Sequence, residues 1–335
     1  MKKWWVWALL LLVVSVALIA GYWYWQKDNQ SPLGRKKMGG ELPLEKYDFD
    51  ELRKRGGRVS EIVIKGEIEE VSQRREYYGL EAEGFSTREI AFKSEGKWIS
   101  GMMNYHPERS SLSKVIIMIR GYAEKEGYYP GSGTWKMADE LAKAGYVTIS
   151  LDFLGYGNSE GESLDMLVGR FEKVPAVMDL IASVKALSWV NKDSIGIWAH
   201  SNGGQIGLSV AEVMGERIPM VLWAPMTNPF PKSVLETIDE GSPVKEAIED
   251  FEKNYDVRRY AFENYYEWMK DSPVLIFQGD KDEWCEVEWQ QEVIRGINKV
   301  SGKARLEVVS GDDHNFSKNW PEVAEKSIQF FNNML

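Results

Sequence analysis

The stretch 194–208, SIGIWAHSNGGQIGL, decides the fold. Its first half is apolar, with Ile195 and Ile197 typical of the end of a buried strand, and from Gln205 it continues as an apolar helix. The five residues between, AHSNG at 199–203, have the small-x-Ser-x-Gly spacing of a nucleophile elbow. The flanking positions have to be small because strand and helix backbones nearly touch there. We predict that Ser201 is a nucleophile on a sharp strand-to-helix turn; the alternative is a turn that only ends a strand.

Apolar strands alternate with amphipathic helical segments on both sides of this stretch. A hairpin is expected over 90–103, followed by strands and then by a closing helix over 321–335. This alternation predicts an α/β fold with a mostly parallel sheet covered by helices on both faces. In such sheets the reactive residues gather at the carboxyl ends of the strands. The expected strands after the hairpin are 114–119, 146–151, 194–198, 219–224, 273–278 and 304–309.

Composition excludes several classes of protein. The chain has 335 residues, of which 44% are hydrophobic, enough for one large α/β domain with appendages. The net charge is −10 with acidic and basic residues interspersed, which argues against nucleic-acid binding. The one cysteine, Cys285, rules out an intramolecular disulfide, and with only three histidines no zinc cluster of Cys and His is expected.

The N-terminal residues predict a membrane anchor. Lys2 and Lys3 precede an uncharged run over 4–25, whose length suits the hydrocarbon core of a bilayer. Trp and Tyr cluster at both ends of the run, as in the aromatic belts of membrane spans. We expect residues 1–25 to form a transmembrane helix with the catalytic domain outside the cytoplasm. The alternative is a cleaved signal peptide, because the triplet SVA at 15–17 resembles a cleavage site.

Changes in composition and periodicity along the chain mark three further segments. Residues 26–87 contain a polar linker and a charged extension, to which we assign no function. In the extension the partial alternation of Ile62, Ile64 and Ile68 indicates some strand packed on the domain. The regular alternation of strands and helices occupies residues 88–335. Within it, residues 228–271 are rich in Glu and aromatic side chains and interrupt the alternation between two core strands. We expect this segment to form a helical cap over the site; the alternative is an ordinary long connection.

A serine nucleophile needs a base, and three histidines are available. His200 immediately precedes Ser201, so its side chain should point away from the hydroxyl and support the turn instead. His106 follows the early hairpin and is expected at the surface. His314 lies in GDDHNF at 311–316, in the loop after the last predicted strand, from which an imidazole can reach the elbow. We therefore predict His314 as the base.

The base in turn needs a carboxylate that orients it. The loop QGDKD at 278–282 follows the strand VLIF. Asp282 matches the usual Gly-x-x-Asp spacing and is preferred over Asp280. The order Ser, Asp, His along the chain is the order that accompanies this elbow.

The negative oxygen of a tetrahedral intermediate needs fixed hydrogen-bond donors. We predict the backbone N–H groups of Asn202, directly after the nucleophile, and of Tyr122, in the loop after the first central strand. Gly121 lets that loop come close. Arg120 is a candidate for binding an anionic group of the substrate; the alternative is an ordinary loop charge.

With these motifs the chain from about Arg88 onward resembles the α/β-hydrolase superfamily, above all the catalytic domains of its prolyl-oligopeptidase and dienelactone-hydrolase-like branches. The matching pieces are RGY at 120–122, DFLGYGNSEG at 152–161, the elbow and the acid and histidine loops. The resemblance implies an eight-stranded sheet, a Ser-His-Asp triad, and neither a cofactor nor a metal. Ala199 stands where the family usually has Gly, and Arg120 where His is common.

The favoured prediction is a membrane-anchored serine hydrolase that cleaves carboxylic esters through an acyl-enzyme. A serine peptidase for small peptides would use the same residues. Residues 26–87 are too few for the β-propeller of the oligopeptidases, which favours esters. The third possibility is a binding protein with this fold and no catalysis. The partners expected are therefore a small ester or short peptide and a lipid bilayer, with no nucleic acid.

Overall fold

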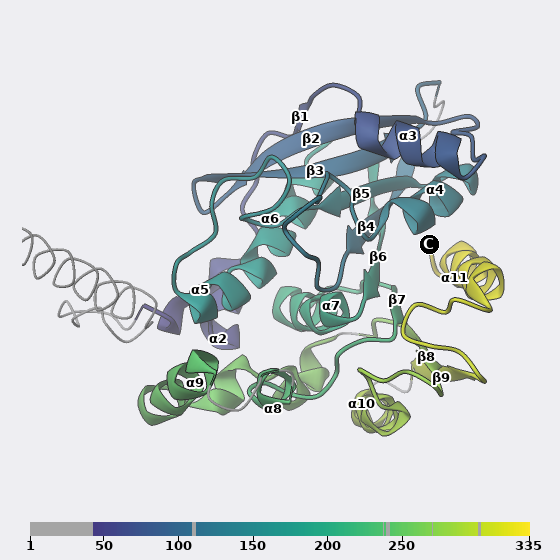
Figure 1. Ribbon diagram of the computed structural model, residues 1–335. Helices are drawn as coiled ribbons and strands as arrows, with labels where there is room; N and C mark the ends of the chain where they lie inside the picture. Colours follow the sequence, from purple (N-terminus) through teal and green to yellow (C-terminus); the bar gives the residue numbers. More distant parts are fainter. Residues whose placement is uncertain (1–42, 109–111, 237, 239–241, 270, 301–302) are drawn as a thin grey trace, which may run out of the picture.

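The computed structural model describes residues 43–108, 112–236, 238, 242–269, 271–300 and 303–335 (Figure 1). The predicted transmembrane segment, residues 1–25, lies outside this part. Within the described residues, no helix combines the length and the apolar character that crossing a bilayer requires.

One sheet of nine strands runs through the domain, in the order β1-β2-β3-β5-β4-β6-β7-β8-β9. The last six strands in this order, from β5 to β9, are mutually parallel, and β1, β2 and β3 pair antiparallel. The predicted hairpin turns at Glu95 and Gly96, both with positive φ, as a two-residue turn requires. The strands are β1 (Val63–Ile64), β2 (Ser86–Ser94), β3 (Lys97–Tyr105), β4 (Ser113–Ile119), β5 (Val147–Leu151), β6 (Val190–His200), β7 (Met220–Trp223), β8 (Val274–Gly279) and β9 (Ala304–Val309).

The expectation of about eight strands is corrected by β1. Val63 and Ile64 pair with Ala91 and Ile90 of β2, so part of the N-terminal extension belongs to the sheet. Helix α2 (Phe49–Arg55) of the same extension buries Phe49 and Leu52 in the main core. The strand falls where the alternation of Ile62 and Ile64 indicates some strand, but its pairing with β2 is set by the neighbouring strand.

The central strands are buried on both faces. Successive side chains of β4 point to opposite sides, so that Ile117 joins one hydrophobic cluster while Ile116 and Met118 join the other. Helices α4 (Trp135–Lys143) and α11 (Trp320–Met334) cover the second cluster, and α3 (Glu69–Tyr77) adds Val71 to it. Figure 1 shows α4 and α11 on one side of the sheet and α6 and α7 on the other.

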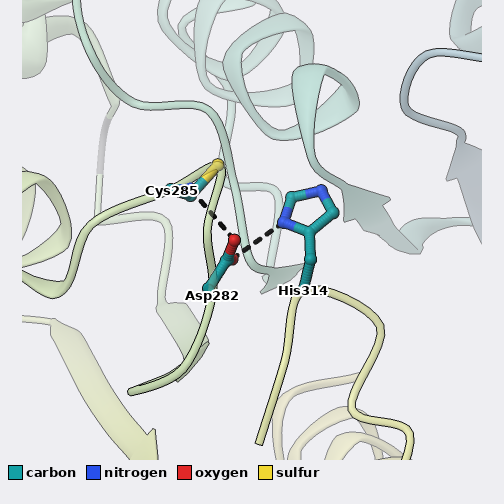
Figure 2. A group of neighbouring side chains, drawn as sticks. All are labelled: Asp282, Cys285 and His314. Atoms are coloured by element: carbon teal, nitrogen blue, oxygen red, sulfur yellow. Dashed lines mark hydrogen bonds and ion pairs between the residues drawn. The ribbon is translucent and has the colours of Figure 1, made fainter.

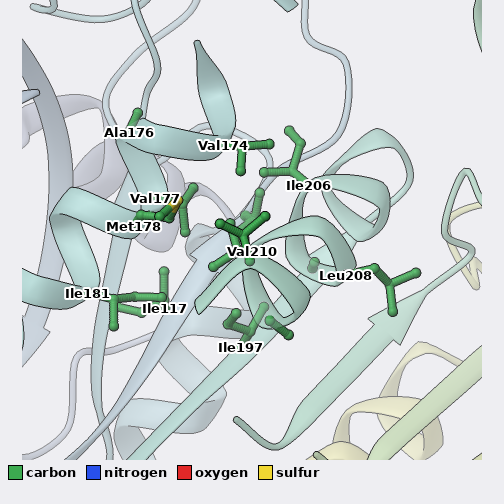
Figure 3. Packing of buried hydrophobic residues seen from close by; sticks show 14 of the residues in the cluster. Ile117, Val174, Ala176, Val177, Met178, Ile181, Ile197, Ile206, Leu208 and Val210 are labelled. Carbon is green, nitrogen blue, oxygen red and sulfur yellow. The ribbon is translucent and has the colours of Figure 1, made fainter. Parts of the chain in front are cut away.

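Helices α6 (Lys173–Lys185) and α7 (Asn202–Met214) form the core of the first face. Val177 and Ile181 of α6 pack with Val210 of α7 above Ile117 and Ile197 of the sheet (Figure 3). This packing makes α7 a rigid support for the residue that precedes it, Ser201. Helices α5 (Met166–Phe171) and α10 (Val287–Val300) also contribute to this cluster.

The predicted cap segment, 228–271, packs on the same face. Phe230 and Phe251 meet the ring of Phe171 of α5 at centroid distances of 5.1 and 5.7 Å. The segment therefore shares the main core rather than forming a separate one; whether it covers Ser201 stays a prediction. It contains α8 (Lys232–Leu235), α9 (Pro243–Asn254) and the 3-10 turns η2 (Val257–Tyr260), η3 (Phe262–Asn264) and η4 (Tyr266–Met269).

Candidate active site

Ser201 occupies the sharp turn between β6 and α7. Its backbone has φ +54° and ψ −126°, a conformation that side-chain-bearing residues adopt only when surrounding structure imposes it. A Cβ on Gly203 would lie 2.4 Å from the carbonyl oxygen of Ile119, and one on Gly204 would lie 2.3 Å from Cβ of Pro225. These contacts give the physical reason for the small residues of the motif.

The loop after β4 lies directly against this turn. A Cβ on Gly121 would be 2.7 Å from Cβ of Ser201 and 3.3 Å from its Oγ. The next residue, Tyr122, is 77% exposed, and its backbone N–H donates to no acceptor among the described residues. Asn202 is the first residue of α7, so its N–H has no partner inside the helix and lies at the positive end of the helix dipole. Both expected oxyanion donors therefore flank Ser201.

Asp282 and His314 come together through the loops after β8 and β9. Oδ2 of Asp282 lies 2.8 Å from Nδ1 of His314 (Figure 2). The same oxygen accepts a hydrogen bond of 2.8 Å from Nε2 of Gln278. Oδ1 accepts from the backbone N–H groups of Trp284 and Cys285, at 2.8 and 3.0 Å. Burial opposes ionisation of Asp282, but its bond to His314 and these further donors outweigh burial and lower its pKa. The carboxylate is thus charged and held in one orientation.

The neighbouring aspartates hold the histidine loop. The buried Asp312 accepts from the backbone N–H groups of Lys318 and Asn319, at 3.2 and 2.9 Å. Asp280 accepts from the N–H of Gly311 at 2.7 Å and does not contact His314. Of the two carboxylates in the acid loop, it is Asp282 that lies beside the imidazole. Sequence reasoning set Asp312 aside as the orienting carboxylate and did not predict the supporting bonds of Asp312 and Gln278, because local spacing does not show which groups these side chains meet.

His200 connects the elbow with the histidine loop. Its Nε2 lies 3.0 Å from the carbonyl oxygen of His314, and the two ring centres are 4.8 Å apart. Burial, followed by the charge of His314, lowers the pKa of His200 to about 4. His200 is therefore neutral near pH 7 and supports the position of His314.

In the described part of the chain, no hydrogen bond joins the Ser201 hydroxyl to the His314 ring. Figure 2 shows the second ring nitrogen of His314 turned away from Asp282. His106 contacts the carbonyl oxygens of Gly84 and Ala142.

Arg120 is buried, with only 5% of its surface exposed. Its Nη1 and Nη2 donate to the carbonyl oxygens of Gly121 and Asp152, both at 2.8 Å, and its Nε donates to the Tyr128 hydroxyl at 3.0 Å. The guanidinium also lies 4.0 Å from the centre of the Tyr156 ring. Arg120 thus fixes the oxyanion loop by bonds to neutral oxygens, and its binding of an anionic substrate stays a prediction.

Asp282, Cys285 and His314 also place three metal-ligand atom types within 4.8 Å of one another. Metal binding needs a thiolate, whereas burial and the charge of Asp282 raise the pKa of the Cys285 thiol well above its usual range. Both oxygens of Asp282 already accept hydrogen bonds from N–H donors. The donor set therefore suits an acid–base pair better than a metal.

Comparison with known proteins agrees with this geometry. The family model described as "Serine aminopeptidase, S33" matches residues 110–261, which include the oxyanion loop and the elbow. None of the curated protein sequences compared with the chain matches it.

Solved structures of esterases have the same fold. Acetyl xylan esterase 1 from Thermoanaerobacterium sp. JW/SL YS485 is 16% identical, with a TM-score of 0.59 over 88% of this chain and 99% of that one. The Pyrococcus furiosus esterase Pf2001 is 19% identical, with a TM-score of 0.55 over 74% and 93%. Est1E from Butyrivibrio proteoclasticus, solved with ferulic acid bound, is 19% identical, with a TM-score of 0.54 over 73% and 98%. The match over residues 110–261 and the shared fold together show that this chain is similar to serine hydrolases of the α/β-hydrolase superfamily.

Proposed function

We propose that the enzyme hydrolyses carboxylic esters, with Ser201 as nucleophile, His314 as general base and Asp282 as the carboxylate that orients the base. The 2.8 Å contact between Asp282 and His314 carries this proposal. The negative charge of Asp282 keeps the proton on Nδ1 and leaves Nε2 free to accept the serine proton. It also stabilises the imidazolium that forms as Ser201 attacks.

The reaction then follows from the parts around Ser201. Its oxygen adds to the ester carbonyl, and the N–H groups of Tyr122 and Asn202 stabilise the resulting oxyanion. His314 returns the proton to the leaving alcohol, which departs and leaves an acyl-enzyme. A water molecule, deprotonated by His314, then releases the acid and restores Ser201.

The structural neighbours support an ester substrate. The acetyl xylan esterase points to acetylated carbohydrates, and ferulic acid in Est1E points to aromatic acyl groups. A peptidase acting on small peptides remains a second candidate, because the matching family model is that of a serine aminopeptidase. Rates on acetyl and feruloyl esters, compared with aminoacyl anilides, separate the two. Faster turnover of the anilides would overturn the ester proposal.

A fluorophosphonate probe tests the nucleophile directly. We expect the probe to label the wild-type protein and not the Ser201→Ala variant, while circular dichroism shows both to be folded. Labelling of another serine would refute the assignment of Ser201. Absence of any labelling would favour a binding protein that uses the fold without catalysis.

We also propose that residues 4–25 anchor the enzyme in a membrane with the catalytic domain outside the cytoplasm. The uncharged run between two aromatic clusters supports this. The full chain should stay with membranes in alkaline carbonate and be cleaved by protease added to intact cells. Release of the protein by carbonate would refute the anchor, and protection from protease would refute the orientation.

A further inference from the structure

Arg170, at the end of α5, points a cation toward the helix that follows Ser201. Its Nη2 donates to Oε1 of Gln205 on α7 and to Oγ of Ser233, the latter at 3.2 Å. Both acceptors are neutral, and no carboxylate of the described residues forms an ion pair with Arg170. Nε and Nη1 of Arg170 donate to no acceptor among the described residues, so the guanidinium has N–H groups available to a ligand.

Lys173, three residues further on, is a second cation without a carboxylate partner among the described residues. Its half-buried ammonium has neither a hydrogen bond nor an ion pair with any described residue, and lies 5.9 Å from the centre of the Phe153 ring. The guanidinium of Arg120 lies 5.5 Å from the centre of the same ring. Three cations therefore gather beside the oxyanion loop and the start of α7.

The acidic groups near Lys173 are engaged elsewhere. Glu162 pairs with Lys125, and Glu172 lies 4.0 Å from Lys97. Burial, followed by the charges of Arg170 and Arg120, lowers the pKa of Lys173 to about 8 in spite of both glutamates. Burial also lowers the pKa of Arg170 to about 10. Cations held in partly dry surroundings without an anion are unfavourable in the free protein, and an anionic ligand would relieve that cost.

Arg170 lines a small cavity that extends to Asn202, the residue after the nucleophile. Its volume is about 40 Å³, and Arg170, Gln205 and Asn202 are among the residues that line it. Asn202 follows the nucleophile directly, and Gln205 lies one helical turn beyond Ser201, or about 6 Å along the axis. The space beside Arg170 has roughly the volume of one or two waters, which suits a small head group rather than a long chain.

We propose that Arg170 and Lys173 form a binding site for a carboxylate of the substrate, so that the preferred esters carry a second, anionic group a few bonds from the reacting carbonyl. A half-ester of a short dicarboxylic acid has this chemistry. The inference rests on the proposed ester hydrolysis and adds the class of substrate.

The test compares monoethyl glutarate with ethyl 4-carbamoylbutanoate, in which a neutral amide of the same shape replaces the carboxylate. We expect the wild-type enzyme to prefer the anionic ester in kcat/KM by on the order of tenfold or more, the usual effect of a hydrogen bond to a charged group. Arg170→Gln and Lys173→Gln should each remove most of the preference, and Arg170→Lys should keep part of it. Lys143→Gln, an exposed lysine of α4, is the matched control and should change nothing. A wild-type ratio near one, or a ratio unaffected by the substitutions, would overturn the proposal.

A binding measurement separates this proposal from the catalytic one. Calorimetry of glutarate with the Ser201→Ala protein needs no turnover. Glutarate binding that weakens with salt and is lost when Arg170→Gln is added supports the carboxylate site. If neither ester is hydrolysed in that case, only the esterase proposal fails. Hydrolysis of both esters at equal rates, without glutarate binding, removes the carboxylate site and leaves the esterase.

Discussion

The Asp282 carboxylate lies 2.8 Å from Nδ1 of His314, although 32 residues separate the two in the sequence. The two loops meet because β8 and β9 are neighbouring parallel strands whose carboxyl ends share one edge of the sheet. A Cβ on Gly279, where β8 ends, would lie 2.3 Å from the carbonyl oxygen of Asp312, so the loops touch at their backbones. The pair is therefore positioned by the sheet and not by flexible side chains.

Replacing Asp282 by Asn should lower kcat by about 10³- to 10⁴-fold, because the amide no longer holds the productive tautomer of His314. KM should change little, since Asp282 does not touch the substrate. Asp280→Asn is the matched control: it contacts Gly311 and not the imidazole, so it should cost less than about tenfold. Steady-state kinetics on an aryl ester measure both, and equal losses would contradict the roles assigned here.

Gly121→Ala should reduce kcat while leaving the protein folded. The added methyl group would lie 2.7 Å from Cβ of Ser201 and 3.2 Å from the carbonyl oxygen of His200, so the loop has to move away from the elbow. The N–H of Tyr122 would move with it, and loss of one oxyanion donor costs about 10²- to 10³-fold. Gly66→Ala, where a Cβ meets nothing within 4 Å, should be silent. Unchanged kcat in Gly121→Ala would argue against an oxyanion donor in this loop.

Glu212 of α7 should make the protein less stable at higher pH. It is fully buried, and neither carboxyl oxygen has a partner within the described residues. Burial, followed by the charge of Glu263, raises its pKa well above the ordinary value of 4.5. Because the folded state holds the proton more tightly, the stability from Glu212 is complete below about pH 4.5 and is lost as pH rises toward the folded pKa.

Glu212→Gln should therefore stabilise the protein by more than about 1 kcal/mol at pH 8, with the gain disappearing near pH 4. Urea unfolding of both proteins at several pH values measures this. The exposed Glu249→Gln is the control and should show no such trend. A gain that does not depend on pH would show that the pKa of Glu212 is the same in the folded and unfolded states, against the shift described above.

The preference for an anionic ester should fall as pH rises through about 8, where Lys173 loses its charge. Bound carboxylate requires the protonated ammonium, so the preference is complete below this pKa and declines above it. Arg170, with a pKa of about 10, should maintain a residual preference above pH 8. The ratio of kcat/KM for the two glutarate derivatives, measured from pH 6 to 9, reports this, and Lys173→Gln should flatten the curve. A decline that persists in Lys173→Gln would assign it to another group.

The amino-acid sequence by itself determined the α/β class and the elbow. Both follow from local rules: strand and helix periods differ, and only small residues fit around a turn such as that at Ser201. The loops that carry Asp282 and His314 were also recognisable, because each comes directly after an apolar strand. The Gly-x-x-Asp spacing also favoured Asp282 over Asp280, and Asp282 is the carboxylate that lies beside the imidazole.

Only the tertiary structure decided the contacts between segments that are distant in the chain. β1 became a strand through pairing with β2, and the nearest imidazole in sequence, His200, became a support for His314. Arg120 proved to be held by Tyr128 of its own loop and by the carbonyl oxygen of Asp152 after β5. Arg170 meets Gln205 because α5 and α7 pack in one core, and the same packing leaves it without a carboxylate partner among the described residues. Periodicity assigns a residue to a face of an element, whereas the partner on that face is set by how the elements pack together.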